Sequence, residues 1–300
     1  MNTAMVQPPG RQGPGRMPAP VVARLDVSLA RRAGGVLPGE HRTLGVGAGT
    51  ELAQLRPYEP GDDLRQLDPA ASARTAVPHV RQHVPERAMT TWLLLDVSPS
   101  MAFGTGDRLK SDVAEGVALA IAQLAVRRGG RLALVTAGAA KARVLEPRGG
   151  RAAIAAVRRV LREGVACDAT EHPVTLADSL SRVHRLARSR GLVVVASDLR
   201  DEGWARPLRR LTARHSAVVV EVTDPREAAL PEAGRMLLTD PETGMQVEAD
   251  TSSPQLRRAF SQAERERRSR VLEATRRAGA EHVTLSTQGD WLRELTRRLR

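Results

Sequence analysis

Two groups of oxygen-bearing side chains stand at the ends of apolar segments and could together hold a metal ion. Asp96, Ser98 and Ser100 alternate directly after the apolar run Trp92–Leu95, and Asp198 closes a later apolar run. Carboxylate and hydroxyl oxygens are hard donors of the kind that Mg²⁺ prefers in a near-octahedral shell. Two carboxylates would balance a divalent cation, and the hydroxyls would add ligands without adding charge. The spacing therefore predicts a divalent-cation site, for Mg²⁺ or Mn²⁺.

Simpler roles for the same residues stay open on the sequence alone. Asp96 could cap the turn after its strand, with Ser98 and Ser100 as turn formers, because short polar side chains hydrogen-bond nearby backbone amides. Asp198 could cap a turn in the same way.

A cation site of this kind requires strands whose carboxyl ends meet at one edge of a sheet. In open α/β sheets, ligands bind beyond these ends, where the strand order reverses. Continuous apolar runs are typical of strands buried on both faces of a helix-covered parallel sheet. Such runs occur at 92–96, 132–136, 192–198, 217–222 and 283–286.

Apolar residues at helical spacing lie between and after these runs. They predict helices around residues 109–124, 154–161, 176–187, 204–211, 254–277 and 291–299. Asp107 is the expected N-cap of the first, and Ser253-Pro254 opens the fifth, with Pro at the first helical position. The turn Asp240–Gly244 predicts a hairpin inserted near the sheet edge. Strands alternating with helices predict an α/β fold over residues 88–300, a doubly wound, mostly parallel sheet with helices on both faces.

The first 87 residues have a different character. Residues 1–20 contain five prolines and three glycines with almost nothing to bury, which predicts a disordered tail. Residues 21–87 combine turn residues with short apolar runs and predict a small, irregular, β-containing module.

Asp96-x-Ser98-x-Ser100 after an apolar strand resembles the metal-ion-dependent adhesion site (MIDAS) of von Willebrand factor A domains. The upstream segment Tyr58–Asp68, with Ser72–Thr75 after it, resembles a bacterial family known only as domain of unknown function fifty-eight. His41-Arg42, the nearby glycines and the tail from Ser286 to Leu299 resemble it too. Pro69 departs from the pattern, because the family often has Trp there.

The resemblance implies a von Willebrand A-like fold and a set of metal ligands. Ser98 and Ser100 would bind the ion directly, and Asp96 and Asp198 directly or through water. A threonine from a second loop usually contributes, but Val174 stands at the expected place. Thr175 is our candidate for this ligand, with Thr170 or no threonine as the alternatives.

The resemblance also implies a function. Proteins of this family resemble companions of MoxR-type AAA+ ATPases that act in chaperone-like assembly or maturation of other proteins. We therefore expect a non-enzymatic adaptor whose metal captures an acidic side chain of a client protein. The chain has no Gly-x₄-Gly-Lys-Ser/Thr sequence, so the ATPase is expected to be a separate polypeptide.

Two alternatives belong to other function classes. An Asp at a strand end with Mg²⁺ also begins haloacid-dehalogenase-like phosphatases, but those need a second Asp two residues later, where this chain has Ser98. A formal net charge of +12 invites a nucleic-acid partner. However, the arginines are interleaved with acidic residues, as in the salt-bridged stretch Arg257–Arg277, and only 2% of residues are aromatic, so we expect no nucleic-acid binding.

Composition also bears on the compartment. A single cysteine, Cys167, excludes an internal disulfide framework. No apolar run approaches the roughly 20 residues that span a bilayer, and no signal-peptide pattern is present. We therefore expect a cytoplasmic protein without a transmembrane segment, while the arginines leave peripheral contact with a membrane surface open.

Overall fold

The structure is a computed structural model that describes residues 51–60, 62–84, 89–127 and 129–298. The predicted disordered tail and residues 21–50 of the predicted module, which include the family-like residues His41-Arg42, lie outside the described residues. The chain divides into two compact units, described here as residues 51–84 and 89–298.

The smaller unit is a β-hairpin with helical turns in its connection. Strands β1 (Glu51–Pro57) and β2 (His79–Val84) pair antiparallel, with η2 (Leu64–Gln66) and α2 (Pro69–Thr75) between them. Side chains of Asp63 and Asp68 cap these two helical segments, and Pro69 occupies the first position of α2. Asp63 and Asp68 of the acidic segment thus have local structural roles in this unit. The small antiparallel sheet confirms a β-containing module.

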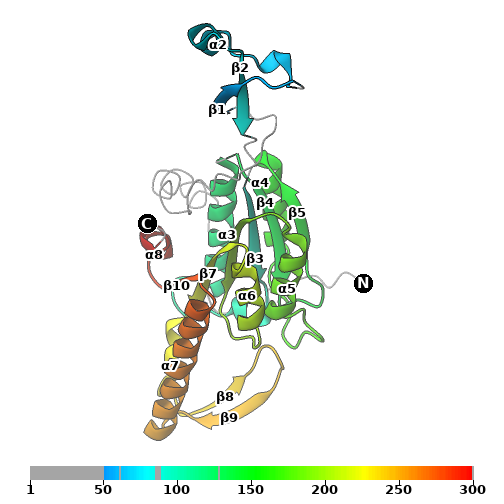
Figure 1. Cartoon of the computed structure of the whole chain (residues 1–300). Helices are drawn as coiled ribbons and strands as arrows, with labels where there is room; N and C mark the ends of the chain where they lie inside the picture. Colours follow the sequence, from blue (N-terminus) through cyan, green and yellow to red (C-terminus); the bar gives the residue numbers. More distant parts are fainter. Residues whose placement is uncertain (1–50, 61, 85–88, 128, 299–300) are drawn as a thin grey trace. The chain divides into compact units, whose positions relative to one another are not determined.

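The larger unit is built on a six-stranded sheet with the order β10-β7-β6-β3-β4-β5 (Figure 1). The strands are β3 (Thr90–Asp96), β4 (Arg131–Ala137), β5 (Val144–Arg148), β6 (Gly191–Ser197), β7 (Ser216–Thr223) and β10 (Glu281–Ser286). All neighbours pair in parallel except β5, which is antiparallel to β4. This confirms the predicted doubly wound, mostly parallel fold.

Helices cover both faces of this sheet. Leu93 and Leu95 of β3 belong to a core that includes residues of α3 (Lys110–Arg127), α4 (Gly150–Leu161) and α8 (Trp291–Arg298). Trp92 and Leu94 point into a second core with α5 (Leu176–Leu186), α6 (Ala205–Thr212) and α7 (Pro254–Arg277). Consecutive side chains of a strand face opposite sides, so an unbroken apolar run fills both cores.

Three details differ from the sequence-based expectations. Asp107 does not cap α3; its carboxylate accepts the amide of Gly289 at 2.7 Å, and Leu109 precedes the helix with its amide bonded to Asp112. The antiparallel edge strand β5 was not predicted, because Val144–Arg148 contains a proline and charged residues. The predicted hairpin exists as β8 (Arg235–Thr239) and β9 (Gln246–Asp250), but as a separate two-stranded sheet.

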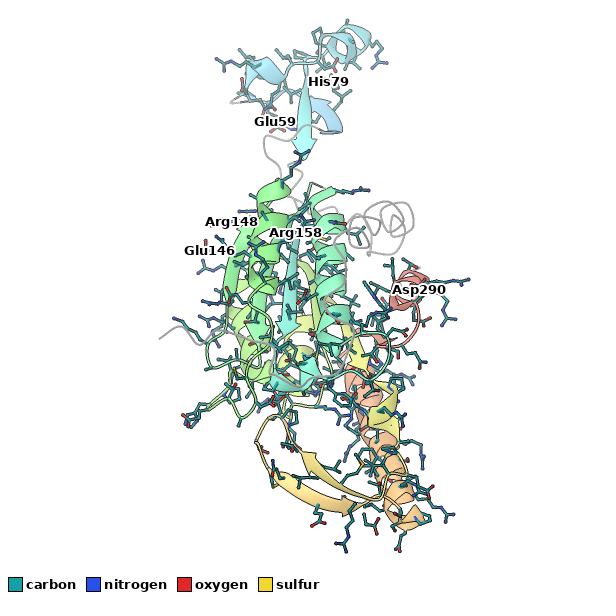
Figure 2. All side chains as sticks on the ribbon, turned by 180° about the vertical axis from the view of Figure 1, so that it is seen from behind. Glu59, His79, Glu146, Arg148, Arg158 and Asp290 are labelled. Carbon is teal, nitrogen blue, oxygen red and sulfur yellow. The ribbon has the colours of Figure 1, made fainter. Side chains whose placement is uncertain are left out.

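The outer surface carries charges of both signs. Figure 2 shows Glu146 and Arg148 on β5 with Arg158 on the neighbouring helix α4, all exposed. Helix α7 contains the ion pairs Arg267–Glu264, Arg268–Glu264 and Arg277–Glu273. The stretch Arg257–Arg277 is therefore a salt-bridged helix, as its sequence predicted. None of the helices in the described part of the chain combines the length and apolarity that crossing a bilayer requires.

Candidate metal site

The strand order brings the two predicted groups of oxygen donors together. Strands β3 and β6 are parallel neighbours in register, with Leu95 beside Ala196, and they flank the point where the strand order reverses. Asp96 ends β3, and Asp198 directly follows β6. This is the edge where ligands bind in open α/β sheets.

Asp96 is held on both of its carboxylate oxygens. Oδ1 accepts the amide of Ser98 at 2.9 Å, and Oδ2 accepts the hydroxyl of Ser197 at 2.5 Å. The first contact is the turn-capping role considered for Asp96. Both contacts fix the buried carboxylate at the start of the loop that carries the two serines.

Ser98 and Ser100 converge, as their spacing predicts. Their hydroxyl oxygens lie 3.1 Å apart, because the 3₁₀ turn η3 (Pro99–Ala102) curls the chain after β3. The turn fits closely against Gly138 after β4, where an added Cβ would lie 2.4 Å from the Ser98 nitrogen. Hydrogen bonding from the Ser100 side chain also reaches the carboxylate of Asp198.

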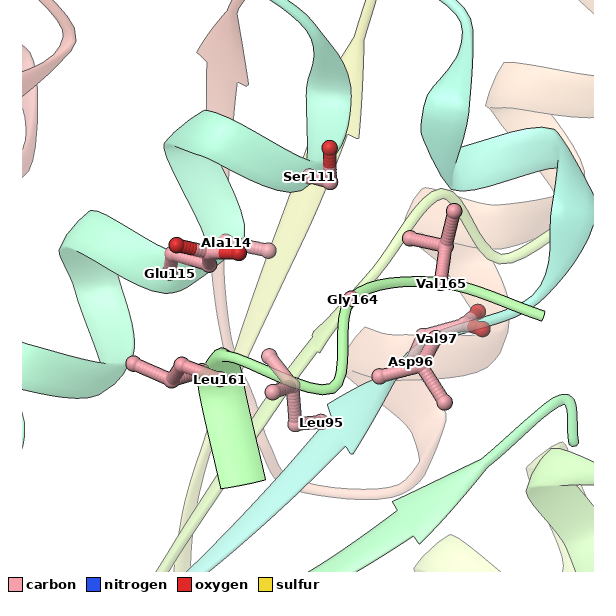
Figure 3. Close-up of a pocket in the computed structure, with 9 residues that line it drawn as sticks. All are labelled: Leu95, Asp96, Val97, Ser111, Ala114, Glu115, Leu161, Gly164 and Val165. Carbon is pink, nitrogen blue, oxygen red and sulfur yellow. The ribbon is translucent and has the colours of Figure 1, made fainter. Parts of the chain in front are cut away.

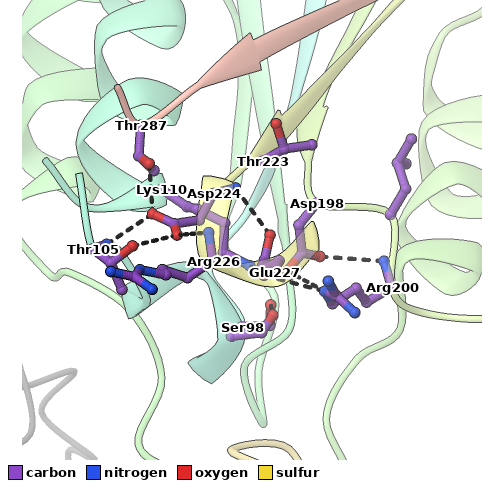
Figure 4. Close-up of polar contacts among 12 residues, drawn as sticks. Ser98, Thr105, Lys110, Asp198, Arg200, Thr223, Asp224, Arg226, Glu227 and Thr287 are labelled. Carbon is purple, nitrogen blue, oxygen red and sulfur yellow. Dashed lines mark hydrogen bonds and ion pairs between the residues drawn. The ribbon is translucent and has the colours of Figure 1, made fainter. Parts of the chain in front are cut away.

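The negative charge of Asp198 is neutralised by Lys110, a residue that the sequence analysis did not assign to the site. Nζ of Lys110, the first residue of α3, lies 2.6 Å from Asp198 and 2.6 Å from Glu227. The Lys110 side chain is completely buried. Arg200 adds a second positive charge, 3.3 Å from Glu227, and its amide donates to Asp198 at 3.2 Å (Figure 4). Two carboxylates are therefore matched by two cations.

The turn η4 (Pro225–Ala228), which carries Glu227, is anchored by Asp224. The buried Asp224 carboxylate accepts the amide and hydroxyl of Thr105 at 2.7 and 2.6 Å, and the hydroxyl of Thr287 at 2.6 Å. It thereby ties the ends of β7 and β10 to the loop before α3 (Figure 4).

A glutamate from the β8–β9 hairpin completes the cluster. Oε1 of Glu242 accepts the amide of Ser100 at 3.0 Å, across 142 positions of sequence. Hydrogen bonding from the Ser100 side chain reaches the same carboxylate. Ser100 thus lies between the carboxylates of Asp198 and Glu242.

The carboxylates of the cluster differ in their electrostatic state. Burial and then the negative charge of Asp198 raise the pKa of Asp96 to about 7. Burial also raises the pKa of Glu242, and the charges of Asp198 and Asp240 add to the effect. Burial alone would raise the pKa of Asp198, but Lys110 and Arg200 outweigh it and lower that pKa below its usual value. Asp96 and Glu242 are therefore the two carboxylates of the cluster whose negative charge no cationic side chain of the described residues balances.

The charge balance of these carboxylates indicates whether the site fits a divalent cation. Within the described residues, no lysine or arginine forms an ion pair with Asp96 or Glu242. Two uncompensated carboxylates beside two hydroxyls match a divalent cation in both charge and donor type. No three His, Cys, Asp or Glu side chains of the described residues form a ready metal cluster; the donor set here mixes carboxylates with hydroxyls.

Thr175, the predicted fourth ligand, has another contact. Its Oγ1 accepts the amide of Asp178 at 3.0 Å in the capping box of α5. Its neighbour Val174 accepts the amide of Gly138, so this loop lies at the end of β4. The Thr170 hydroxyl instead donates to the carbonyl of Cys167. The structure thus brings Asp96, Ser98, Ser100 and Asp198 together, and it gives neither threonine a contact with them.

A small pocket lies beside this cluster (Figure 3), and its cavity volume of about 10 Å³ has room for roughly one water molecule. Its walls are mostly apolar, and helix α3 and the end of α4 contribute to them. The residues that line it are Leu95, Asp96, Val97, Ser111, Ala114, Glu115, Leu161, Gly164 and Val165.

Residues 54–270 match the protein family described as Protein of unknown function DUF58. The chain belongs to this family. The match confirms the family that the upstream segment and the Asp-x-Ser-x-Ser motif predicted. The DUF58 chain is also 37% identical to an uncharacterized protein of Mycobacterium tuberculosis, Rv1480, over 286 residues, which cover 93% of this chain and 88% of that protein.

Two solved structures show some similarity to this chain. BatB, a conserved hypothetical protein of Bacteroides thetaiotaomicron, is 15% identical, with a TM-score of 0.45 over 71% of this chain and 97% of that chain. The SpRpn10 VWA domain is 14% identical, with a TM-score of 0.39 over 69% and 93% of the two chains. The strand order described above, rather than either likeness, defines the fold of the DUF58 chain.

Sequence reasoning missed four charged members of this site, which are Lys110, Arg200, Glu227 and Glu242. One feature of the sequence could have drawn attention to Lys110: it is one of only two lysines among the 46 lysine and arginine residues of the chain. Glu242 lies in the predicted turn Asp240–Gly244, but no pattern placed that turn against the serines. Glu227 had no signal that separated it from other acidic residues.

Proposed function

We propose that this DUF58 protein is a non-enzymatic, cation-dependent protein-binding adaptor. Asp96, Ser98, Ser100 and Asp198 would hold Mg²⁺ or Mn²⁺ at the carboxyl end of the sheet. The observation that carries the proposal is electrostatic: Lys110 and Arg200 match Asp198 and Glu227, whereas Asp96 and Glu242 face the serine hydroxyls without a cation among the described residues.

Each residue has a distinct part in this proposal. Asp96 supplies charge and fixes the loop through the Ser98 amide. Ser98 and Ser100 supply neutral oxygens, which leave a bound ion able to attract a further anion. Asp198, held by Lys110, positions Ser100 and closes the side of the site toward β6. A bound divalent cation would supply the positive charge that captures a carboxylate of a client protein.

The partners of the proposal follow from the family resemblance. We propose that a MoxR-type AAA+ ATPase is the companion, and that it co-purifies through the client whose acidic side chain the cation captures. The pair would act in chaperone-like assembly or maturation of other proteins. Because such an ATPase requires ATP, the cytoplasm is the proposed compartment.

Affinity purification of the tagged full chain tests this proposal. We expect an AAA+ ATPase to co-purify in Mg²⁺, to be released by EDTA, and to be lost with Asp96→Ala. Asp290→Ala, which removes a carboxylate that caps α8, is the matched control and should retain the ATPase.

A second assay separates the adaptor from an enzyme. The purified protein is incubated with p-nitrophenyl phosphate and Mg²⁺. Turnover that requires Mg²⁺ and disappears with Asp96→Ala would replace the adaptor by a phosphoryl-transfer enzyme, whereas no turnover is expected.

A further inference from the structure

The turn at the tip of the β8–β9 hairpin places Glu242 against Ser100 of the candidate metal site. Glu242 accepts the Ser100 amide at 3.0 Å, and its side chain is partly buried there. The hairpin lies below the carboxyl ends of the sheet strands (Figures 1 and 2). Glu242 thus reaches the serine loop of the candidate metal site from a distant part of the chain.

The turn that carries Glu242 is preorganised. Oδ1 of Asp240 accepts the amide of Glu242 at 3.0 Å, and Oδ2 accepts the hydroxyl of Thr243 at 2.7 Å. The Pro241 carbonyl accepts the amide of Ala169 at 2.9 Å, which fixes the turn to the loop after α4. These contacts hold the carboxylate at a defined position.

Little else of the hairpin is buried. Leu237 is 62% exposed, Met245 62% and Val247 51%. Thr251 at the base is buried and bonds the carbonyl of Gly234 at 2.7 Å. Because the strands bury little apolar surface, the hairpin is held mainly at its base and through the polar contacts of its tip.

We propose that Glu242 is a ligand of the cation site supplied by the chain itself, in the position that a partner's carboxylate would take. The inference rests on the cation site of the proposed function. A carboxylate anchored on the Ser100 amide, with no cationic side chain beside it among the described residues, has the charge and location of such a ligand. A partner would then bind by displacing Glu242, and the hairpin would be released when it does.

Titration calorimetry of the full chain with MnCl₂ tests the ligand role. We expect Glu242→Gln to weaken Mn²⁺ binding by roughly tenfold, because one charged ligand is lost. Glu248→Gln removes the same charge from β9, where the Glu248 side chain is 67% exposed. This matched control should leave the Mn²⁺ affinity unchanged.

Hydrogen–deuterium exchange of residues 235–250 supplies a second measurement. Mg²⁺ should slow exchange at the tip of the wild-type hairpin and of Glu248→Gln, but not of Glu242→Gln, because exchange reports local opening.

The outcomes separate the two proposals. Equal Mn²⁺ affinity of wild type and Glu242→Gln, or tighter binding by the variant, would overturn the ligand role of Glu242 and leave the cation site standing. Unchanged exchange in Mg²⁺ with wild-type protein that binds the ion would do the same. If wild type binds no Mn²⁺, the cation site of the proposed function fails instead.

Discussion

The Nζ atom of Lys110 and the Oδ2 atom of Asp198 lie 2.6 Å apart in an ion pair that is closed to solvent. Glu227 accepts from the same ammonium group, and the ring centre of Phe103 lies 5.9 Å from it. Burial would lower the pKa of Lys110, but the charges of Asp198 and Glu227 outweigh it and raise the pKa above its usual value. The carboxylate that follows β6 is therefore already paired with a buried ammonium group of α3, next to the candidate cation site.

Replacing this lysine should destabilise the protein strongly. Lys110→Met keeps much of the side-chain volume but leaves Asp198 and Glu227 without their ammonium group. Breaking a buried pair in this way costs about 3–5 kcal/mol. Urea unfolding at pH 7 measures the change in the free energy of unfolding. Lys141→Met is the control, because Lys141 is exposed, and equal losses in the two variants would contradict a structural role of the ion pair.

How far the sequence predicts this architecture depends on whether the signal is local. The unbroken apolar runs predicted the central strands, because Leu93 and Leu95 enter one core while Trp92 and Leu94 enter the other. The spacing of Asp96, Ser98 and Ser100 predicted a converging loop, because a turn after a strand brings alternate side chains to one side. These features are contained within a few consecutive residues.

Contacts between distant segments could not be predicted in the same way. Glu242 meets Ser100 across 142 positions, and only the fold sets that distance. Asp107 has the composition of a helix N-cap, but tertiary structure gives its carboxylate to Gly289 instead. Strand β5 lies at the edge of the sheet, where burial is incomplete and the apolar pattern fades.

Asp96 should make the stability of the metal-free protein depend on pH. Its pKa is raised from the ordinary value of 3.8 to about 7, so the folded state binds the proton more tightly than the unfolded state. This contribution to stability is complete below about pH 3.8 and is lost as the pH rises to about 7.

The variant Asp96→Asn cannot titrate and isolates this effect. Measured by urea unfolding in EDTA, its stability relative to wild type should increase between pH 4 and pH 8, by at most about 4 kcal/mol. Carboxylates with lowered pKa values, such as Asp224 and Glu264, are common to both proteins and cancel in the difference. A difference that does not change with pH would contradict the raised pKa.

Gly138 should be required for the position of Ser98. Its φ is +90°, and a Cβ would lie 2.4 Å from the Ser98 nitrogen and 2.5 Å from its Cα and Cβ. Gly138→Ala therefore combines backbone strain with a clash that displaces the serine loop. We expect lower thermal stability and weaker Mn²⁺ binding by calorimetry.

Gly129→Ala separates strain from displacement. Gly129 also has a positive φ, +68°, but an added Cβ would have no atom within 4 Å. This variant should lose about 1 kcal/mol through backbone strain alone and keep its Mn²⁺ affinity. Equal Mn²⁺ affinities of the two alanine variants would show that Gly138 does not position the site.

Glu242→Gln should have opposite effects on the bare ion and on a partner. If Glu242 occupies the ligand position for most of the time, the apparent affinity for a partner carboxylate is reduced by the fraction of molecules that are free. Removing the charge should therefore increase co-purification of the AAA+ ATPase severalfold in Mg²⁺, even though Mn²⁺ alone binds less tightly. Glu248→Gln should change neither quantity. Quantitative immunoblotting of the purified complexes measures the ratio, and a parallel decrease in ion binding and capture would contradict displacement of Glu242 by the partner.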